Sequence, residues 1–507
     1  MSCIRNQARN EQPGTKQMVM ERPSGMKASF IEVRVISTWH GLGSRRLNAE
    51  AGVGRIGFRV RAWGDAMRVL VPLLLVAIVI TRSTWAEDSR QIPVRLSVID
   101  NGMIRLGVDL NRGGSITFLA DAKNRENVVN AYDLGREIQQ SYFSGPKPFG
   151  KGHHPGWKGW GWNPIAAGDV FGNTGKVISH KRTKDSIYVK CVPRQWALNG
   201  VPGECTFETW IRLEASTVRI RCRLNNRRPD TNQYGARHQE LPAVYTTATL
   251  HRLVTYDGDA PFTGEDLREI RNSGPPWVYW QSTENWAALV NNEDWGLGVF
   301  HPGAQLFVGG FSGTRNRGGP RDPSTGYISP LHTEIIDHNI SYEYEYILIL
   351  GLLKHIRSYV YQHRPASRPD FQFLKDRQHW QYVNARDDGF PIKDHLSIRV
   401  ASSDPQLISP PMCWKAKNVP KIYIRAAYHT KNRQGRLFWR RHGDKGFSTK
   451  QSVGFDAKDD GRYHTYEIDL ASEPTYRDTI SQLRFDPVSQ GNGNERVDVR
   501  FISWKSR

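Results

Sequence analysis

The sequence predicts an all-β protein with mainly antiparallel strands, for three reasons. Apolar and polar residues alternate with a period of two in many segments, which is the pattern of half-buried strands. Turn signals such as Asn101-Gly102 separate these segments at short intervals. Helical periodicity is scarce, and its best example is the amphipathic stretch 352–362. The clearest alternating segments are 94–98, 104–108, 218–222 and 342–350.

The first element of the chain with a clear pattern is a secretion signal at residues 67–86. Met67-Arg68 is followed by an apolar run of about 12 residues and by a small-residue site ending at Ala86. This run is shorter than the roughly 20 residues that cross a bilayer as a helix. We therefore expect cleavage after Ala86 and a secreted or periplasmic protein. The alternative is a membrane anchor retained through residues 68–86.

Residues 1–66 are rich in arginine and contain no helix or strand pattern. We interpret them as a non-native extension ahead of a translation start at Met67. The chain that remains after removal of residues 1–86 still has a positive net charge.

A domain boundary is predicted between residues 364 and 370, where periodicity stops and two prolines occur. It divides the mature chain into residues 92–364 and residues 370–507, each long enough to bury a core of its own. The second part contains strand patterns at 422–424, 437–439, 466–470 and 497–501. These predict a compact sandwich or jelly roll.

Two segments carry a resemblance to known families. The hairpin pattern of residues 285–300 is similar to that of the large antiparallel β-supersandwich of galactose-mutarotase-like domains. Residues 460–470 and 482–488 resemble the galactose-binding-like jelly rolls appended to carbohydrate-active enzymes. The resemblance implies a supersandwich at 92–364, as the candidate catalytic domain, and a smaller sandwich at 370–507. It also implies a carbohydrate theme, but a fold alone does not establish catalysis.

The stretch 135–173 is the strongest functional signal. Three tryptophans, two histidines and several glycines gather within a dozen of its positions. Indole rings on a glycine-rich loop offer flat apolar faces and N–H donors, which suit a pyranose ring. The alternative is that these aromatics plug the end of a β-sandwich. The predicted substrate-binding residues are Gln140, His153, His154, Trp157, Trp160, Trp162 and Asn163.

His238 and Glu240 form the best local pair of titratable residues. On an extended strand, two positions apart, they lie on one face, where an imidazole and a carboxylate can act as base and acid on a sugar. The alternative is a surface strand whose His and Glu are merely solvated. Mutarotase-like enzymes use a His and a Glu from separated segments, so this close pair departs from the family pattern.

Two reactions remain open at this stage. β-Elimination from a uronic-acid polymer needs a group that neutralises the carboxylate and a base near the C5 proton. Hydrolysis needs two carboxylates roughly 5–10 Å apart. For elimination the candidates are Arg136, Asn163, Tyr142, His153 and His238, and for hydrolysis Glu240 with Glu137, Asp169 or Glu208. The predicted catalytic set is His238, Glu240, Tyr142 and Arg136.

The charge balance favours acidic partners. The formal net charge is +20, and long-range steering would draw anionic polysaccharides to the protein. No recognition helix, zinc-finger spacing or RNA-binding signature occurs, so nucleic acid is not expected as a partner. A solvated basic surface is the alternative interpretation.

No cofactor is predicted. C-x-x-C, H-E-x-x-H and EF-hand spacings are absent from the sequence, so no transition-metal site is expected. The galactose-binding-like resemblance would allow a structural calcium near Asp486, which could instead shape the turn before Pro487. A hairpin-closing disulfide between Cys191 and Cys205 would fit an oxidising compartment.

These observations predict a secreted protein that acts on an anionic polysaccharide as a lyase or a glycoside hydrolase. The alternative is a non-catalytic cell-surface protein that binds glycans through the aromatic residues of its loop.

Overall fold

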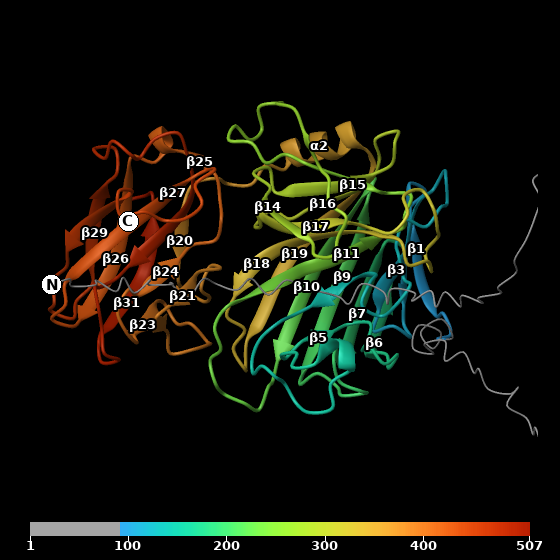
Figure 1. Cartoon of the computed structure of the whole chain (residues 1–507), viewed down its shortest axis with the longest axis horizontal. Helices are drawn as coiled ribbons and strands as arrows, with labels where there is room; N and C mark the ends of the chain where they lie inside the picture. Colours follow the sequence, from blue (N-terminus) through green and yellow to red (C-terminus); the bar gives the residue numbers. More distant parts are fainter. Residues whose placement is uncertain (1–91) are drawn as a thin grey trace, which may run out of the picture. The chain divides into compact units, whose positions relative to one another are not determined.

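The computed structural model describes residues 92–507, which fall within one compact unit and build four sheets of mainly antiparallel strands (Figure 1). The predicted all-β fold is confirmed. The extension 1–66 and the signal 67–86 lie outside the described residues. Within 92–507, no helix has the length and apolar character needed to span a membrane.

The first sheet has ten strands and carries the predicted pair His238 and Glu240. Near its centre β11 and β18 pair side by side, although they are far apart in the sequence (Figure 1). The strands in order are β1 (Leu96–Asp100), β2 (Ile104–Asp109), β3 (Ser115–Asp121), β4 (Ile138–Ser141), β11 (Arg237–Thr246), β18 (Thr325–Glu334), β17 (Leu306–Ser312) and β14 (Val278–Gln281), with β5 (Pro164–Ile165) and β8 (Arg194–Gln195) joined through β4.

The second sheet has nine strands. β10 and β19 pair along most of their length, as their strict alternation predicts. The strands in order are β13 (Arg268–Ile270), β12 (Arg252–Thr255), β15 (Trp286–Val290), β16 (Trp295–Phe300), β19 (Ser341–Leu352), β10 (Thr217–Asn226), β9 (Cys205–Glu214), β7 (Ser186–Val192) and β6 (Lys176–Arg182).

A single hydrophobic core lies between these two sheets. It takes side chains from both, such as Leu106 of β2 and Leu348 of β19, each 0 % exposed. The predicted helix is confirmed as α2 (Leu353–Gln362). Ile356 and Val360 of α2 pack on a separate cluster with β15 and β19, so the helix covers part of the second sheet's outer face.

Residues 370–503 form the other two sheets around their own core. The third sheet contains β22 (Ala385–Arg386), β23 (Leu396–Val400), β31 (Arg496–Ser503), β26 (Lys421–His429) and β29 (His464–Asp469), with β20 (Asp370–Gln372) on β31. The fourth contains β21 (Gln381–Val383), β24 (Gln406–Ile408), β30 (Thr479–Asp486), β27 (Gln434–Arg441) and β28 (Ser452–Asp456), with β25 (Trp414–Lys415) on β30.

Trp439 and Asp486, in this part of the chain, both have internal partners. Trp439 is 0 % exposed and packs edge-on against Tyr476, with ring centroids 5.4 Å apart. Both oxygens of Asp486 accept hydrogen bonds from the guanidinium of Arg484, at 2.7 and 2.6 Å. A guanidinium therefore stands where the resemblance would have allowed a calcium ion.

The loop after β2 lies so close to the backbone of Ala166 that one of its positions requires glycine. Gly113 has φ +61°, and a Cβ there would lie 1.9 Å from the carbonyl oxygen of Ala166. Gly102 also has a positive φ, +83°, but a Cβ there meets nothing within 4 Å. Comparing substitutions at the two glycines therefore distinguishes the cost of the left-handed backbone conformation from the cost of steric overlap.

We expect Gly113→Ala to lower the free energy of unfolding by at least about 2 kcal/mol more than Gly102→Ala, because only Gly113 adds an overlap with backbone to the cost of the left-handed conformation. Urea denaturation of both variants measures the difference. Equal losses would show that the approach of Ala166 is not what requires glycine at position 113.

Candidate functional site

A bulge in β11 decides which of its side chains share a face. Between Glu240 and Val244 the pairing shifts, so that β11 contains one residue more than β18 over the same length. The alternation therefore changes phase. His238 and Glu240 lie on the same face as Ala243 and Tyr245, whereas Val244 enters the core between the sheets.

The face that carries Glu240 is covered by a second apolar layer, on the side of the first sheet away from the core. Neighbouring side chains on the same strands, such as Phe307 and Ile328, point into the core instead. The outer layer consists of Ala243, Tyr245, Trp277, Val308, Tyr327 and Leu331, with Tyr279 and Leu306 packed against it.

Glu240 is held in this layer by a tyrosine. It is 6 % exposed, and the hydroxyl of Tyr327 donates a hydrogen bond to its Oε1. Tyr327 in turn stacks on Tyr245, with ring centroids 4.6 Å apart. Burial and the adjacent Glu240 raise the pKa of Tyr327 well above its usual value. The phenol therefore keeps its proton and remains a donor to the carboxylate.

His238 lies at the more open end of the same face. Its Nδ1 is 2.9 Å from the hydroxyl of Thr333, and its ring lies 5.7 Å from that of Tyr279, tilted by 41°. Burial lowers the pKa of His238, and burial together with Glu240 raises that of Tyr279. At neutral pH the face thus presents a neutral imidazole beside a protonated phenol, a base and an acid.

The glycine-rich loop meets this face at Glu240. A narrow crevice is lined by Glu240, Trp157, Trp196 and Asn163, together with residues of β4 and β5. Its free space is about 10 Å³, room for about one water molecule. The structure thus brings together Trp157, Asn163 and Glu240, which the sequence places far apart. A sugar ring is larger than this space. It can bind only if the loop opens or if the ring lies over the outer rim of the crevice.

The indoles of the loop contact one another. Trp157, in the 3₁₀ turn η2 (Pro155–Trp157), packs edge-on against Trp160 at 4.7 Å and Trp196 at 5.6 Å. Trp160 is half-buried, and its Nε1 donates to Asn163 Oδ1 at 3.1 Å. Trp160 is therefore the loop tryptophan with a face left for a ligand.

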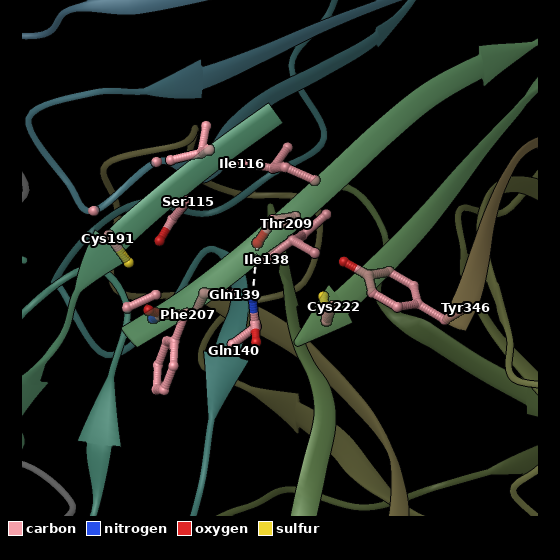
Figure 2. A pocket seen from close by; sticks show the side chains of 14 residues that line it. Ser115, Ile116, Ile138, Gln139, Gln140, Cys191, Phe207, Thr209, Cys222 and Tyr346 are labelled. Atoms are coloured by element: carbon pink, nitrogen blue, oxygen red, sulfur yellow. Dashed lines mark hydrogen bonds between the residues drawn. The ribbon is translucent and has the colours of Figure 1, made fainter. Parts of the chain in front are cut away.

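Gln140, Tyr142 and Trp162 lie in the core, on the other side of the sheet from Glu240. Figure 2 shows Gln140 beside a small pocket between the sheets, and its Nε2 donates to Thr209. The pocket has a volume of about 20 Å³, and the donor–acceptor distance is 2.7 Å. Tyr142 donates to Gln140 at 2.9 Å, and Trp162 donates to Glu204 at 2.9 Å. Their packing gives all three a structural role, and their contact with substrate stays a prediction.

The remaining predicted residues shape loops. His153 donates through Nε2 to the carbonyl of Trp160 at 3.1 Å, and His154 accepts from the backbone of η2 at 3.1 Å. Arg136 follows Gly135, which lines the crevice. Its guanidinium lies 3.2 Å from Asp133 and donates to the carbonyl of Pro323 at 2.8 Å.

The three carboxylates considered as partners of Glu240 for hydrolysis have other partners. Glu137 is fully buried and accepts from Arg112 at 2.7 Å. Asp169 stabilises its own loop, because it accepts a hydrogen bond from Asn173. Glu208 belongs to the second sheet and accepts from Tyr188 at 2.6 Å. Among residues 92–507, Glu240 is the one carboxylate that lines the crevice.

The expected disulfide between Cys191 and Cys205 is absent. Both are buried free thiols, as are Cys222 and Cys413, so residues 92–507 contain no disulfide. Burial raises the pKa of Cys191 to about 12, so the thiol keeps its proton.

Sequence reasoning missed the tyrosines and tryptophans that surround Glu240. Trp277 and Tyr279 follow Pro275-Pro276 and alternate toward the outer face, and Tyr327 lies opposite Tyr245 on β18. A Trp-x-Tyr spacing on a strand would have marked two of them. Nothing in the sequence links Tyr327 with Glu240, because their contact depends on the pairing of β11 with β18.

We expect His238 to titrate below its ordinary pKa of about 6.5, because burial disfavours the imidazolium. An NMR titration of the histidine ring protons measures this, with His238→Gln to assign the signal. A midpoint at or above 6.5 would contradict the burial that the structure gives this ring.

Comparisons with known proteins concern the fold alone. No family model and no curated protein matches the sequence. Matching solved structures include a galactose mutarotase-like protein from Lactobacillus casei (11% identity, 50% of this chain, 100% of that chain, TM-score 0.34). Others are a galactose mutarotase related enzyme from Lactobacillus acidophilus (12%, 50% and 97%, 0.30) and a 4-alpha-glucanotransferase from Thermococcus litoralis (11%, 54% and 42%, 0.28). Likenesses of this size carry no argument about activity.

Proposed function

We propose that the outer face of the first sheet binds a sugar of an anionic polysaccharide and that the protein cleaves this polymer by β-elimination. The observation that carries the proposal is the neutral His238 beside the protonated Tyr279, with Glu240 as the single carboxylate that the described residues bring to the crevice. A base and an acid on one face suit proton abstraction, whereas two-carboxylate hydrolysis lacks its second group here.

The proposed step is balanced within the site. His238 removes the proton from C5 of a uronate, a double bond forms between C4 and C5, and the bond from C4 to the glycosidic oxygen breaks. Tyr279 supplies the proton that the leaving oxygen takes, and solvent returns the proton from His238 to Tyr279. We assign neutralisation of the uronate carboxylate to Arg136 or Asn163, next to the crevice or within it.

Glu240 and Tyr327 have a positioning role in this proposal. Their hydrogen bond fixes the layer on which Tyr279 packs, and the negative charge of Glu240 favours the protonated phenol of Tyr279. The partly exposed Trp160 at the rim supplies an apolar face for a neighbouring sugar.

We further propose that the protein works outside the cytoplasm. The signal-peptide pattern at 67–86 and the basic charge support this, since acidic polysaccharides are extracellular partners of the expected kind.

A second candidate function is glycan binding without chemistry. The narrowness of the crevice favours it, because a sugar that cannot enter would lie over the outer rim, where the half-buried Trp160 offers an apolar face.

The test is incubation of the protein with anionic and neutral polysaccharides, following ultraviolet absorbance of unsaturated uronates and the release of reducing ends. We expect both signals with a uronic-acid polymer. His238→Gln and Tyr279→Phe should each lower the rate by about 100-fold or more, because each removes a proton-transfer group. Tyr188→Phe is the matched control, since it removes a tyrosine–glutamate hydrogen bond from the second sheet and should leave the rate unchanged.

Reducing ends without unsaturated product would replace elimination by hydrolysis. Retained binding with neither product would favour the glycan-binding function. Full activity in His238→Gln would contradict the assigned base.

A further inference from the structure

A cluster of metal-ligating side chains lies on the other side of β18 from the proposed sugar site. Thr333 contacts His238, whereas its neighbours His332 and Glu334 point between the two sheets, where both meet Tyr342 of β19. His379, from the segment between β20 and β21, joins them. One ligand atom from each of His332, Glu334 and His379 lies within 4.8 Å of the others.

The protonation of His332 follows from its neighbours. Its Nε2 lies 2.9 Å from the carbonyl oxygen of Gly303, which can only accept, so Nε2 carries the proton and Nδ1 has a free lone pair. This Nδ1 lies 3.1 Å from the hydroxyl of Tyr342 and 3.8 Å from Oε1 of Glu334.

Nδ1 of His332 and Oε1 of Glu334, the two acceptors at the centre of the cluster, share the protons of their neighbours. The single proton of Tyr342 faces both Nδ1 of His332 and Oε1 of Glu334, which lie 3.1 and 3.0 Å from the phenolic oxygen. Tyr342 can donate to one of the two, and Nδ1 of His379 lies against Oε1 of Glu334 as a second donor. A divalent cation among them would take the place of these protons as the partner of both ligand atoms.

His379 is brought to this cluster by an uncommon backbone conformation. Gln378 and His379 both have positive φ, 49° and 64°, and such conformations persist where the surroundings enforce them, often at ligand sites. The result is a close contact between Nδ1 of His379 and Oε1 of Glu334.

A third histidine lies against the cluster. The ring of His301 is 5.0 Å from that of His332 and the residue is 3 % exposed. Its Nε2 finds no hydrogen-bond partner within residues 92–507. A buried donor of this kind would be satisfied by a water or an anion on a bound metal.

We infer that His332, Glu334 and His379 form a binding site for a divalent transition metal, for which Zn²⁺ is the best match. Two imidazoles and one carboxylate are a typical zinc ligand set, and three protein ligands leave the fourth position for water. The carbonyl of Gly303 on His332 is the outer hydrogen bond that such ligands require. A cavity of about 140 Å³ reaches His379 and Gly303 and provides a path for the ion.

The test uses the full chain, stripped of metal by a chelator and titrated with Zn²⁺ alone, with binding followed by calorimetry and bound metal by mass spectrometry. We expect about one equivalent of Zn²⁺ per chain and a higher melting temperature with zinc. Co²⁺ in place of Zn²⁺ should give the visible absorption of a tetrahedral site.

Two ligand variants and one control separate the site from adventitious binding. His379→Gln and Glu334→Gln should weaken Zn²⁺ binding at least about tenfold. His464→Gln removes a partly exposed histidine that lies 2.9 Å from Asp460, and should bind as the unchanged protein does. Circular dichroism checks that each variant folds, and the Co²⁺ spectrum of the unchanged protein tests the site without any substitution.

Failure of the unchanged protein to bind Zn²⁺, or equal affinity in His379→Gln and Glu334→Gln, would overturn the inference. The cluster would then be a hydrogen-bonded network alone. These outcomes do not depend on polysaccharide cleavage, so they leave the proposed function untouched.

Discussion

The one-residue bulge in β11 is the constraint on which the proposed sugar site depends. A regular strand would send Ala243 and Tyr245 to the face opposite Glu240, and the aromatic layer would lose its central stack. Because the bulge lies between Glu240 and Val244, the strand keeps an apolar residue in the core on one side and a continuous outer layer on the other. Bulges are frequent next to functional sites for this reason.

The outer layer buries the centre of the first sheet on both faces. Its central strands β11 and β18 are buried along nearly their whole length, while β10 of the second sheet alternates between buried and partly exposed positions. A sheet covered on both faces holds its polar groups in low-dielectric surroundings. The directions of the pKa changes at His238, Tyr279 and Tyr327 all follow from that burial.

The sequence was sufficient wherever one face of a strand meets water. The alternation in β10 and β19 identified both strands. The two-residue spacing also placed His238 and Glu240 on one face, although β11 is buried on both faces. It was insufficient where the pairing of strands that are far apart in the sequence decides which side chains come together. Trp162 and Trp160 are two residues apart in the same loop, yet one lies in the core and the other is half-exposed. The cluster around Glu334 was invisible because His379 belongs to another part of the chain and joins it only through the fold.

Strand β18 has a further property because Thr333 contacts His238 on one side while His332 and Glu334 meet Tyr342 on the other. A slip of β18 by two residues would preserve which side chains point inward, but it would move all three by roughly 7 Å. Changes that shift the pairing of β18 with β11 or β17 should therefore disturb both sites at once, even where they touch neither. The register of this one strand, more than the identity of any one side chain, holds the two sites in their relation to each other.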